Sequence, residues 1–216
     1  MNLSLATDVY AVMIDDDAVF LDVGADAYFC LPNIAAHLTL TGRLLATDDE
    51  GLALDLMESG LASEEKAGEA GLSTTSPTLS ARAVMEEFPV HERPRSILQC
   101  WISLISACVC SHHNKTKPLK YRLPPSSRKL ASPATISLLA DINFFRRVVP
   151  WLPVDGECLY RSGLLRRYLI ALGHEVDWIF GVTTWPFNAH CWLQVGDMAL
   201  DDEADRLVAY HHIMVR

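Results

Sequence analysis

The sequence lacks both the long apolar run of a membrane-spanning helix and the basic start of a secretory signal. Its longest nearly apolar run, Ile97 to Cys110, has 14 residues and includes Gln99 and two serines, which is too short to cross a bilayer. The first residues, Met-Asn-Leu-Ser-Leu, have no basic segment followed by a long apolar stretch. We therefore expect a cytoplasmic protein that does not enter a membrane.

Closely spaced cysteines and an excess of basic residues are also missing. Six cysteines in 216 residues, without tight spacing, do not predict a disulfide framework. The C-x-C and H-H spacings of Cys108, Cys110, His112 and His113 do not match a paired zinc motif, so we predict no metal site. The net charge of -9 argues against nucleic-acid binding. No G-x-x-x-x-G-K-[ST] loop is present, so the sequence locates no ATP site.

The negative charge is concentrated in the first part of the chain. Residues 1–82 hold 14 acidic and 3 basic side chains, whereas residues 83–216 hold 13 and 15. A stretch without apolar periodicity, rich in serine, threonine and glutamate, separates the two parts. This composition predicts a module at 1–61, a linker at 62–82 and a second domain at 83–216.

The first module has the pattern of three short strands followed by two helices. The predicted strands are Val9 to Ile14, Ala18 to Val23 and Ala27 to Leu31, and the predicted helices run from Pro32 to about Leu45 and from Asp48 to about Leu61. An edge strand of such a sheet presents unpaired backbone groups to an extended peptide. The residues alone leave open a plain structural subdomain.

The middle of the chain predicts three helices, and the last 60 residues hold the pattern of a reactive cysteine. The three helices span Ala83 to Val90, Arg95 to Ser111 and Ile136 to Val149. A further helix face is marked by Cys158, Ser162, Leu165, Leu169 and Leu172, with Asp155 or Gly156 as cap and Gly173 as stop. Cys158 falls in the first turn, where free N–H groups and the helix dipole stabilise a thiolate.

A histidine and an acid follow on predicted antiparallel strands. Residues 176–182 and 190–195 form two strands, and Gly196-Asp197 turns the chain toward a third. A cysteine at a helix start followed by His190 and an aspartate resembles the layout of papain-like and transglutaminase-like folds. A two-residue turn favours Asp201 on the His190 face, and a turn longer by one residue favours Asp202. Cys191 is expected to pack on the opposite face, and His174 to be a solvated connection residue.

A set of ordered motifs over about 60 residues carries a more specific resemblance. They are Cys158-Leu159-Tyr160-Arg161-Ser162-Gly163-Leu164-Leu165, Gly173, Phe180-Gly181-Val182, Trp185-Pro186-Phe187-Asn188-Ala189-His190-Cys191-Trp192, Val195-Gly196 and Leu200-Asp201-Asp202. The sequence resembles the lasso-peptide biosynthesis B protein, a transglutaminase-like cysteine peptidase that removes the leader from a lasso-peptide precursor. The resemblance implies a triad of Cys158, His190 and Asp202.

The resemblance also implies a role for the first module. Fused B proteins carry a small winged-helix-like leader-recognition unit, in which the leader adds to the edge of the third strand. Mapped onto this chain, the leader-binding strand is formed by Ala27, Tyr28, Phe29, Cys30 and Leu31. The implied partners are the precursor peptide and an asparagine-synthetase-like cyclase, and the family implies ATP-stimulated maturation.

The sequence therefore predicts an α+β protein with a winged-helix-like recognition module followed by a papain/transglutaminase-like cysteine peptidase domain. The hypothesised reaction is cleavage of the leader from the core peptide before macrolactam cyclisation. Two alternatives stay open: an acyltransferase of the transglutaminase type, and a non-catalytic scaffold that delivers the precursor to the cyclase.

Overall fold

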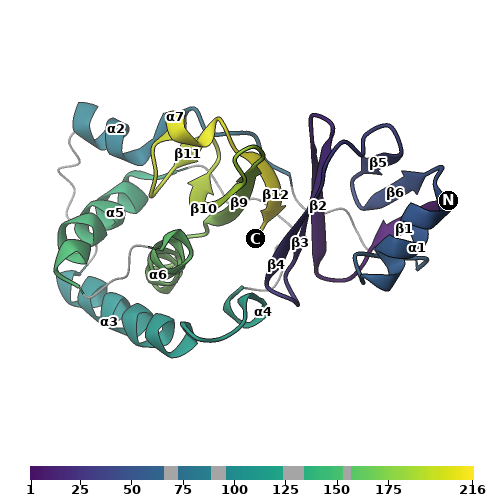
Figure 1. Cartoon of the computed structure of the whole chain (residues 1–216). Coiled ribbons are helices and arrows are strands. Elements are labelled where there is room, and N and C mark those ends of the chain that lie inside the picture. Colours follow the sequence, from purple (N-terminus) through teal and green to yellow (C-terminus); the bar gives the residue numbers. More distant parts are fainter. Residues whose placement is uncertain (66–72, 89–95, 124–133, 153–156) are drawn as a thin grey trace.

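The computed structural model describes residues 1–65, 73–88, 96–123, 134–152 and 157–216. It is a mixed α+β protein in which helices α3, α5 and α6 lie on one side, the N-terminal strands on the other, and β2, β3 and β4 between them (Figure 1). All six cysteines are free thiols. In the part of the chain that is described, no helix is long and apolar enough to cross a membrane.

The first part of the chain is mostly strand. Its elements are β1 (Asn2–Leu5), β2 (Val9–Ile14), β3 (Asp17–Asp22), β4 (Ala27–Leu31), β5 (Leu38–Thr41), β6 (Leu44–Thr47), α1 (Glu50–Glu58) and β7 (Ala62–Ser63). They form two sheets, with strand orders β2-β3-β4 and β5-β6-β1-β7. The prediction of β2, β3 and β4 is confirmed, and α1 begins near its predicted start, where the Asp49 side chain accepts hydrogen bonds from Gly51 and Leu52.

The predicted helix from Pro32 to Leu45 is wrong, because this segment forms the hairpin of β5 and β6. Thr41 pairs with Leu44 across a two-residue turn, in which Gly42 has a φ of 61°. The alternation Leu-Thr-Leu-Thr over 38–41 has the period of a strand, with Leu38 buried and Thr39 exposed. The first module is therefore not the predicted series of three strands and two helices.

The second part of the chain packs helices against one five-stranded sheet. Its elements are β8 (Leu79–Ser80), α2 (Ala81–Glu87), α3 (Ile97–Asn114), α4 (Leu119–Arg122), α5 (Ile136–Val148), a 3₁₀ turn (Val149–Trp151), α6 (Cys158–Ala171), β9 (Asp177–Thr183), β10 (Asn188–Val195), β11 (Met198–Ala199), α7 (Ala204–Leu207) and β12 (His211–Val215). The strand order is β12-β9-β10-β11-β8. The three predicted helices of the middle are confirmed within the described residues, outside which the predicted ends Val90 and Arg95 lie.

The sheet β2-β3-β4 is shared by two hydrophobic cores. Along β3, Ala18 and Phe20 pack into the core of the N-terminal part, whereas Val19 and Leu21 pack into the core of the C-terminal part. All four side chains are at most 1% exposed. The side chains of a strand alternate between faces, so β3 contributes to both cores at once. The division at 61 and 82 stays a prediction, although β8, within the predicted linker, pairs with β11.

Candidate active site

Cys158 is the first residue of α6, as the helical pattern predicts. The residue before it, Glu157, has extended backbone angles, and no described side chain caps the helix start. The N–H groups of the first turn are therefore left for an anion beside them. The predicted caps, Asp155 and Gly156, lie outside the described residues. Cys158 is half-buried at this positive helix end, where a thiolate is stabilised.

Aromatic rings hold the His190 imidazole against the sheet. His190 pairs with Gly181 across β10 and β9. Its ring stacks on Trp192, with centroids 6.0 Å apart, and lies 5.4 Å from the ring of Tyr210. A Cβ atom at Gly181 would lie 2.9 Å from the Trp192 ring and 2.9 Å from Tyr210. Glycine at this position therefore lets both rings close over the strand and fix the imidazole.

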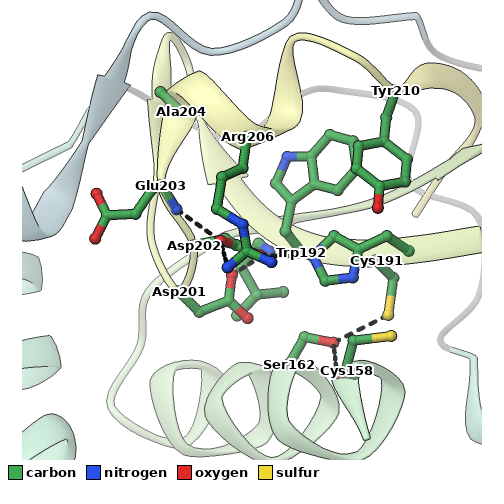
Figure 2. Close-up of polar contacts among 12 residues, drawn as sticks. Cys158, Ser162, Cys191, Trp192, Asp201, Asp202, Glu203, Ala204, Arg206 and Tyr210 are labelled. Atoms are coloured by element: carbon green, nitrogen blue, oxygen red, sulfur yellow. Dashed lines mark hydrogen bonds and ion pairs between the residues drawn. The ribbon is translucent and has the colours of Figure 1, made fainter.

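Asp202 is the carboxylate that contacts His190. Its Oδ2 lies 2.6 Å from His190 Nε2, while its Oδ1 accepts a hydrogen bond of 2.8 Å from the Glu203 N–H and lies 3.4 Å from an Arg206 guanidinium nitrogen. Figure 2 shows this carboxylate between Glu203 and Arg206. Burial favours the protonated acid, but the hydrogen bonds from His190 and Glu203 hold the pKa of Asp202 below its usual range.

Asp201, which the strand pattern favoured, has a different partner. The predicted two-residue turn is confirmed, since Val195 pairs with Met198. However, β11 ends at Ala199, so the alternation of faces does not continue to Asp201. Its Oδ1 instead accepts a hydrogen bond of 2.8 Å from the Leu193 N–H, in the place of a strand carbonyl, and burial raises its pKa to about 7.

The charges of the site form a thiolate–imidazolium pair. Hydrogen bonding from the Cys191 thiol and then from His190 lowers the pKa of Cys158 to about 4. Hydrogen bonds to Asp202 and then to Cys158 raise the pKa of His190 to about 9. Because Asp202 occupies Nε2, Nδ1 is the ring nitrogen left for Cys158. Between the two pKa values, the sulfur is negative and the imidazole positive, as in cysteine nucleophiles activated by a histidine.

Comparison with known families accounts for this arrangement. Residues 112–215 match the model of the transglutaminase-like superfamily, and this range includes Cys158, His190 and Asp202. The chain carries a transglutaminase-like domain. The match supports the fold of a cysteine peptidase or acyltransferase, and domains of this kind are often cysteine-protease-like enzymes. No curated protein and no solved structure matches the chain.

Cys191 lies beside Cys158, a neighbourhood that the sequence did not indicate. As predicted, its side chain lies on the face of β10 opposite His190, but this is the face that α6 covers. Its Sγ lies 3.4 Å from Ser162 Oγ, one helical turn after Cys158. Figure 2 shows the thiols of Cys158 and Cys191 next to each other between the helix and the strand. The sequence feature that could have pointed to this contact is Ser162, which lies one helical turn after Cys158 and contacts Cys191.

The predicted leader-binding residues Ala27–Leu31 form β4, the edge strand of its sheet. The structure brings Tyr28 close to the active site: burial, and then the charges of Cys191 and Cys158, raise the pKa of Tyr28. Its ring lies 5.6 Å from that of Phe187, just before β10. Phe29 and Cys30 are exposed. One end of the candidate site is thus bordered by the N-terminal sheet.

A cavity of about 280 Å³ borders Asp202 and is lined by Arg82, Arg146, Arg161 and Arg206. Carboxylates neutralise part of this positive charge. Arg82 pairs with Glu86 at 2.8 Å and Arg206 with Asp202 at 3.4 Å, and Asp201 and Glu203 in the same wall oppose phosphate. Among the described residues, no group of three histidine, cysteine or acidic side chains is placed to hold a metal ion.

Proposed function

We propose that this protein is a cysteine peptidase that releases the leader of a ribosomally made lasso-peptide precursor before macrolactam cyclisation. The observation that carries the proposal is Cys158 at the start of α6, paired with a His190 that Asp202 contacts at 2.6 Å. The transglutaminase-like match supports the thiol chemistry. The leader as substrate rests on the resemblance of the motifs between Cys158 and Asp202.

Acylation consumes the ion pair. The Cys158 thiolate attacks the scissile carbonyl carbon, and the N–H groups of the first turn of α6 stabilise the oxyanion that forms. The His190 imidazolium gives its proton to the amide nitrogen as the carbon–nitrogen bond breaks. The core peptide leaves as a free amine, the leader stays on Cys158 as a thioester, and His190 is left neutral.

Deacylation restores the pair. Neutral His190 takes a proton from water, the resulting hydroxide adds to the thioester carbonyl, and the carbon–sulfur bond breaks. The leader departs with a new carboxyl group, and Cys158 is again a thiolate beside a protonated imidazole. Asp202 keeps Nε2 as the bound nitrogen throughout, so Nδ1 faces the sulfur in both steps.

The proposed docking site for the leader is the edge of β4. Among the described residues, β4 pairs only with β3, so its other edge offers backbone groups to an extended peptide. The exposed Phe29 provides an apolar contact. Since the ring of Tyr28 on the same strand lies 5.6 Å from that of Phe187, just before the strand of His190, a peptide held on β4 has a short path to the nucleophile, and tethering raises the local concentration of its cleavage site.

The released core peptide is the substrate for a partner of the asparagine-synthetase-like cyclase type, which closes the macrolactam ring. We place both reactions in the cytoplasm, where reducing conditions keep the neighbouring thiols of Cys158 and Cys191 free. Maturation stimulated by ATP is part of the same proposal, and no step described for Cys158, His190 or Asp202 uses it.

Cleavage in ¹⁸O-labelled water tests the reaction. The full chain is incubated with its precursor, and the masses of the two products are measured by mass spectrometry. A peptidase places one ¹⁸O atom in the new carboxyl group of the leader. The transglutaminase-like fold also suits an acyltransferase, which with added glycine methyl ester would give an amide without label. An intact precursor in both cases would contradict the proposal and favour the scaffold.

Binding to β4 is tested in the Cys158→Ala chain, which holds the precursor without cutting it. We expect Phe29→Ala to weaken binding of the leader about tenfold, because a large apolar contact contributes on the order of 1–2 kcal/mol. Phe88→Ala is the matched control, since Phe88 is also exposed and lies at the end of α2. Equal dissociation constants for both variants would argue against docking on β4.

A further inference from the structure

The active site contains a second thiol that the proposed reaction does not use. Cys191 is only 4% exposed, and it projects from β10 toward the start of α6. Figure 2 shows its sulfur beside that of Cys158, with the Ser162 hydroxyl next to both residues. A buried thiol at this place is either simple packing or a hydrogen-bond donor to the nucleophile.

Ser162 is held so that it has a proton to offer. The indole N–H of Trp178 donates to Ser162 Oγ at 2.9 Å, and because indole is only a donor, this bond fixes Oγ as the acceptor. The single hydroxyl proton of Ser162 then has two acceptors within reach: the Cys158 carbonyl oxygen at 2.8 Å and Cys191 Sγ at 3.4 Å. The serine therefore connects the first turn of α6 to Cys191.

We propose that Cys191 is a positioning residue, whose S–H donates to the Cys158 thiolate while Ser162 donates to Cys191. The donors then point in one direction, from Trp178 through Ser162 and Cys191 to Cys158. Each group in this series has one proton and gives it to the next, and the Ser162 proton goes to Cys191 instead of to the Cys158 carbonyl.

The titration of Cys191 agrees with a donor role. Interaction with Cys158, and then burial, raise the pKa of Cys191 well above its usual value, so Cys191 keeps its proton. When Cys158 becomes a thioester it loses its negative charge, and the Cys191 proton then has Ser162 Oγ as its acceptor. The proposed donor therefore stabilises the resting thiolate more than the acyl-enzyme.

The test measures the ionisation of Cys158 without any substrate. The full chain is alkylated with iodoacetamide over pH 3 to 10, and modification of Cys158 is followed in its own peptide by mass spectrometry. We expect Cys191→Ala to raise the midpoint by about one to two pH units, as for the loss of one hydrogen bond to a charged group. Cys191→Ser keeps a donor and should stay within about half a unit of the natural chain.

Two further variants complete the test. Cys100→Ala is the matched control, since it removes another buried thiol, on α3, and should leave the midpoint unchanged. Ser162→Ala should raise the midpoint by a smaller amount than Cys191→Ala. If Cys191→Ala does not fold, Ser162→Ala is measured in its place. An unchanged midpoint in folded Cys191→Ala, or in Ser162→Ala used in its place, would overturn the proposal.

The inference rests on Cys158 as the nucleophile of the proposed function, but its failure is distinguishable from failure of that function. If Cys158 of the natural chain is alkylated at low pH and the midpoint of alkylation rises in Cys191→Ala, the donor role of Cys191 is supported, even if the precursor is never cleaved. Cleavage with equal alkylation midpoints supports the peptidase and rejects the donor.

Discussion

Two histidine–aspartate pairs of nearly equal geometry lie in different regions of this molecule. In the candidate active site, His190 Nε2 is 2.6 Å from Asp202 Oδ2, and in the helical region, His174 Nε2 is 2.7 Å from Asp141 Oδ2. A cysteine accompanies each pair: Cys158 beside His190, and Cys100, whose Sγ is 3.9 Å from Asp141 Oδ1. Residue types and distances alone therefore do not distinguish the two.

The order of the groups and their access to solvent do distinguish them. Cys158 faces the imidazole from a free helix start and has a lowered pKa. Cys100 faces the carboxylate, its N–H is already bonded to the Ser96 carbonyl, and burial raises its pKa. The Asp141 side chain is fully buried, whereas the His190 side chain is 20% exposed. The comparison teaches that a thiol becomes a nucleophile through its helix position and its contact with the base.

The largest expected difference between the regions concerns the two cysteines. Cys158→Ala removes the nucleophile, so release of the leader should fall by at least about 10³-fold. Cys100→Ala removes a thiol of the helical region and should keep cleavage within about twofold. Both rates are measured by chromatography of the precursor. Normal cleavage by Cys158→Ala would remove the basis of the peptidase proposal.

The two aspartates should differ by a somewhat smaller factor. Asp202→Asn leaves the shape of the site but loses the charge that stabilises the imidazolium, so kcat/KM should fall about 10²- to 10⁴-fold. Asp141→Asn, in the other pair, should change kcat/KM little. Asp201→Asn provides a second control, because Asp201 bonds to the Leu193 N–H. Equal losses in Asp201→Asn and Asp202→Asn would contradict the assignment of Asp202 to His190.

Stability should show the reverse difference between the pairs. His174→Ala leaves the buried Asp141 carboxylate without its partner, so the free energy of unfolding should fall by roughly 3 kcal/mol. His190→Ala leaves the more exposed Asp202 and should cost about 1 kcal/mol. Urea unfolding followed by circular dichroism gives both values. A smaller loss in His174→Ala than in His190→Ala would show that the buried pair is not the structural one.

The pH dependence provides the finest test. Below about pH 4 Cys158 gains a proton, and above about pH 9 His190 loses its proton. The ion pair exists between these values, so kcat/KM should rise through the lower one, stay level, and fall through the upper one, changing about tenfold per pH unit outside the plateau. Asp141→Asn should keep both limbs. A single limb near pH 6.5 would indicate an unperturbed histidine acting alone.

Local signals in the sequence predicted the elements that carry the chemistry. The helix that begins at Cys158, the strand of His190 and the turn at Gly196-Asp197 each depend on neighbouring residues, and all are confirmed. The catalytic roles of Cys158, His190 and Asp202 stay predictions. The contact of Asp202 with His190 followed from the resemblance, whereas alternation misled because β11 ends at Ala199.

The features that the sequence did not indicate depend on contacts between distant parts of the chain. His174 was expected in solvent, but its partner Asp141 lies 33 positions earlier on α5. Cys191 was expected to pack only, because nothing local shows that α6 covers its face. The helix predicted from Pro32 to Leu45 is wrong because the strand alternation over Leu38–Thr41 extends over only four residues. So short a pattern is a weak signal compared with the apolar content of the segment.

The double role of β3 has a consequence for any attempt to cut the protein in two. Residues 83–216 expressed alone would present bare apolar surface where Val19 and Leu21 now fit. Such surface drives molecules to associate with one another. We expect the part that holds Cys158 to precipitate before it meets a peptide, so an absence of cleavage by this fragment would report missing support and not missing recognition.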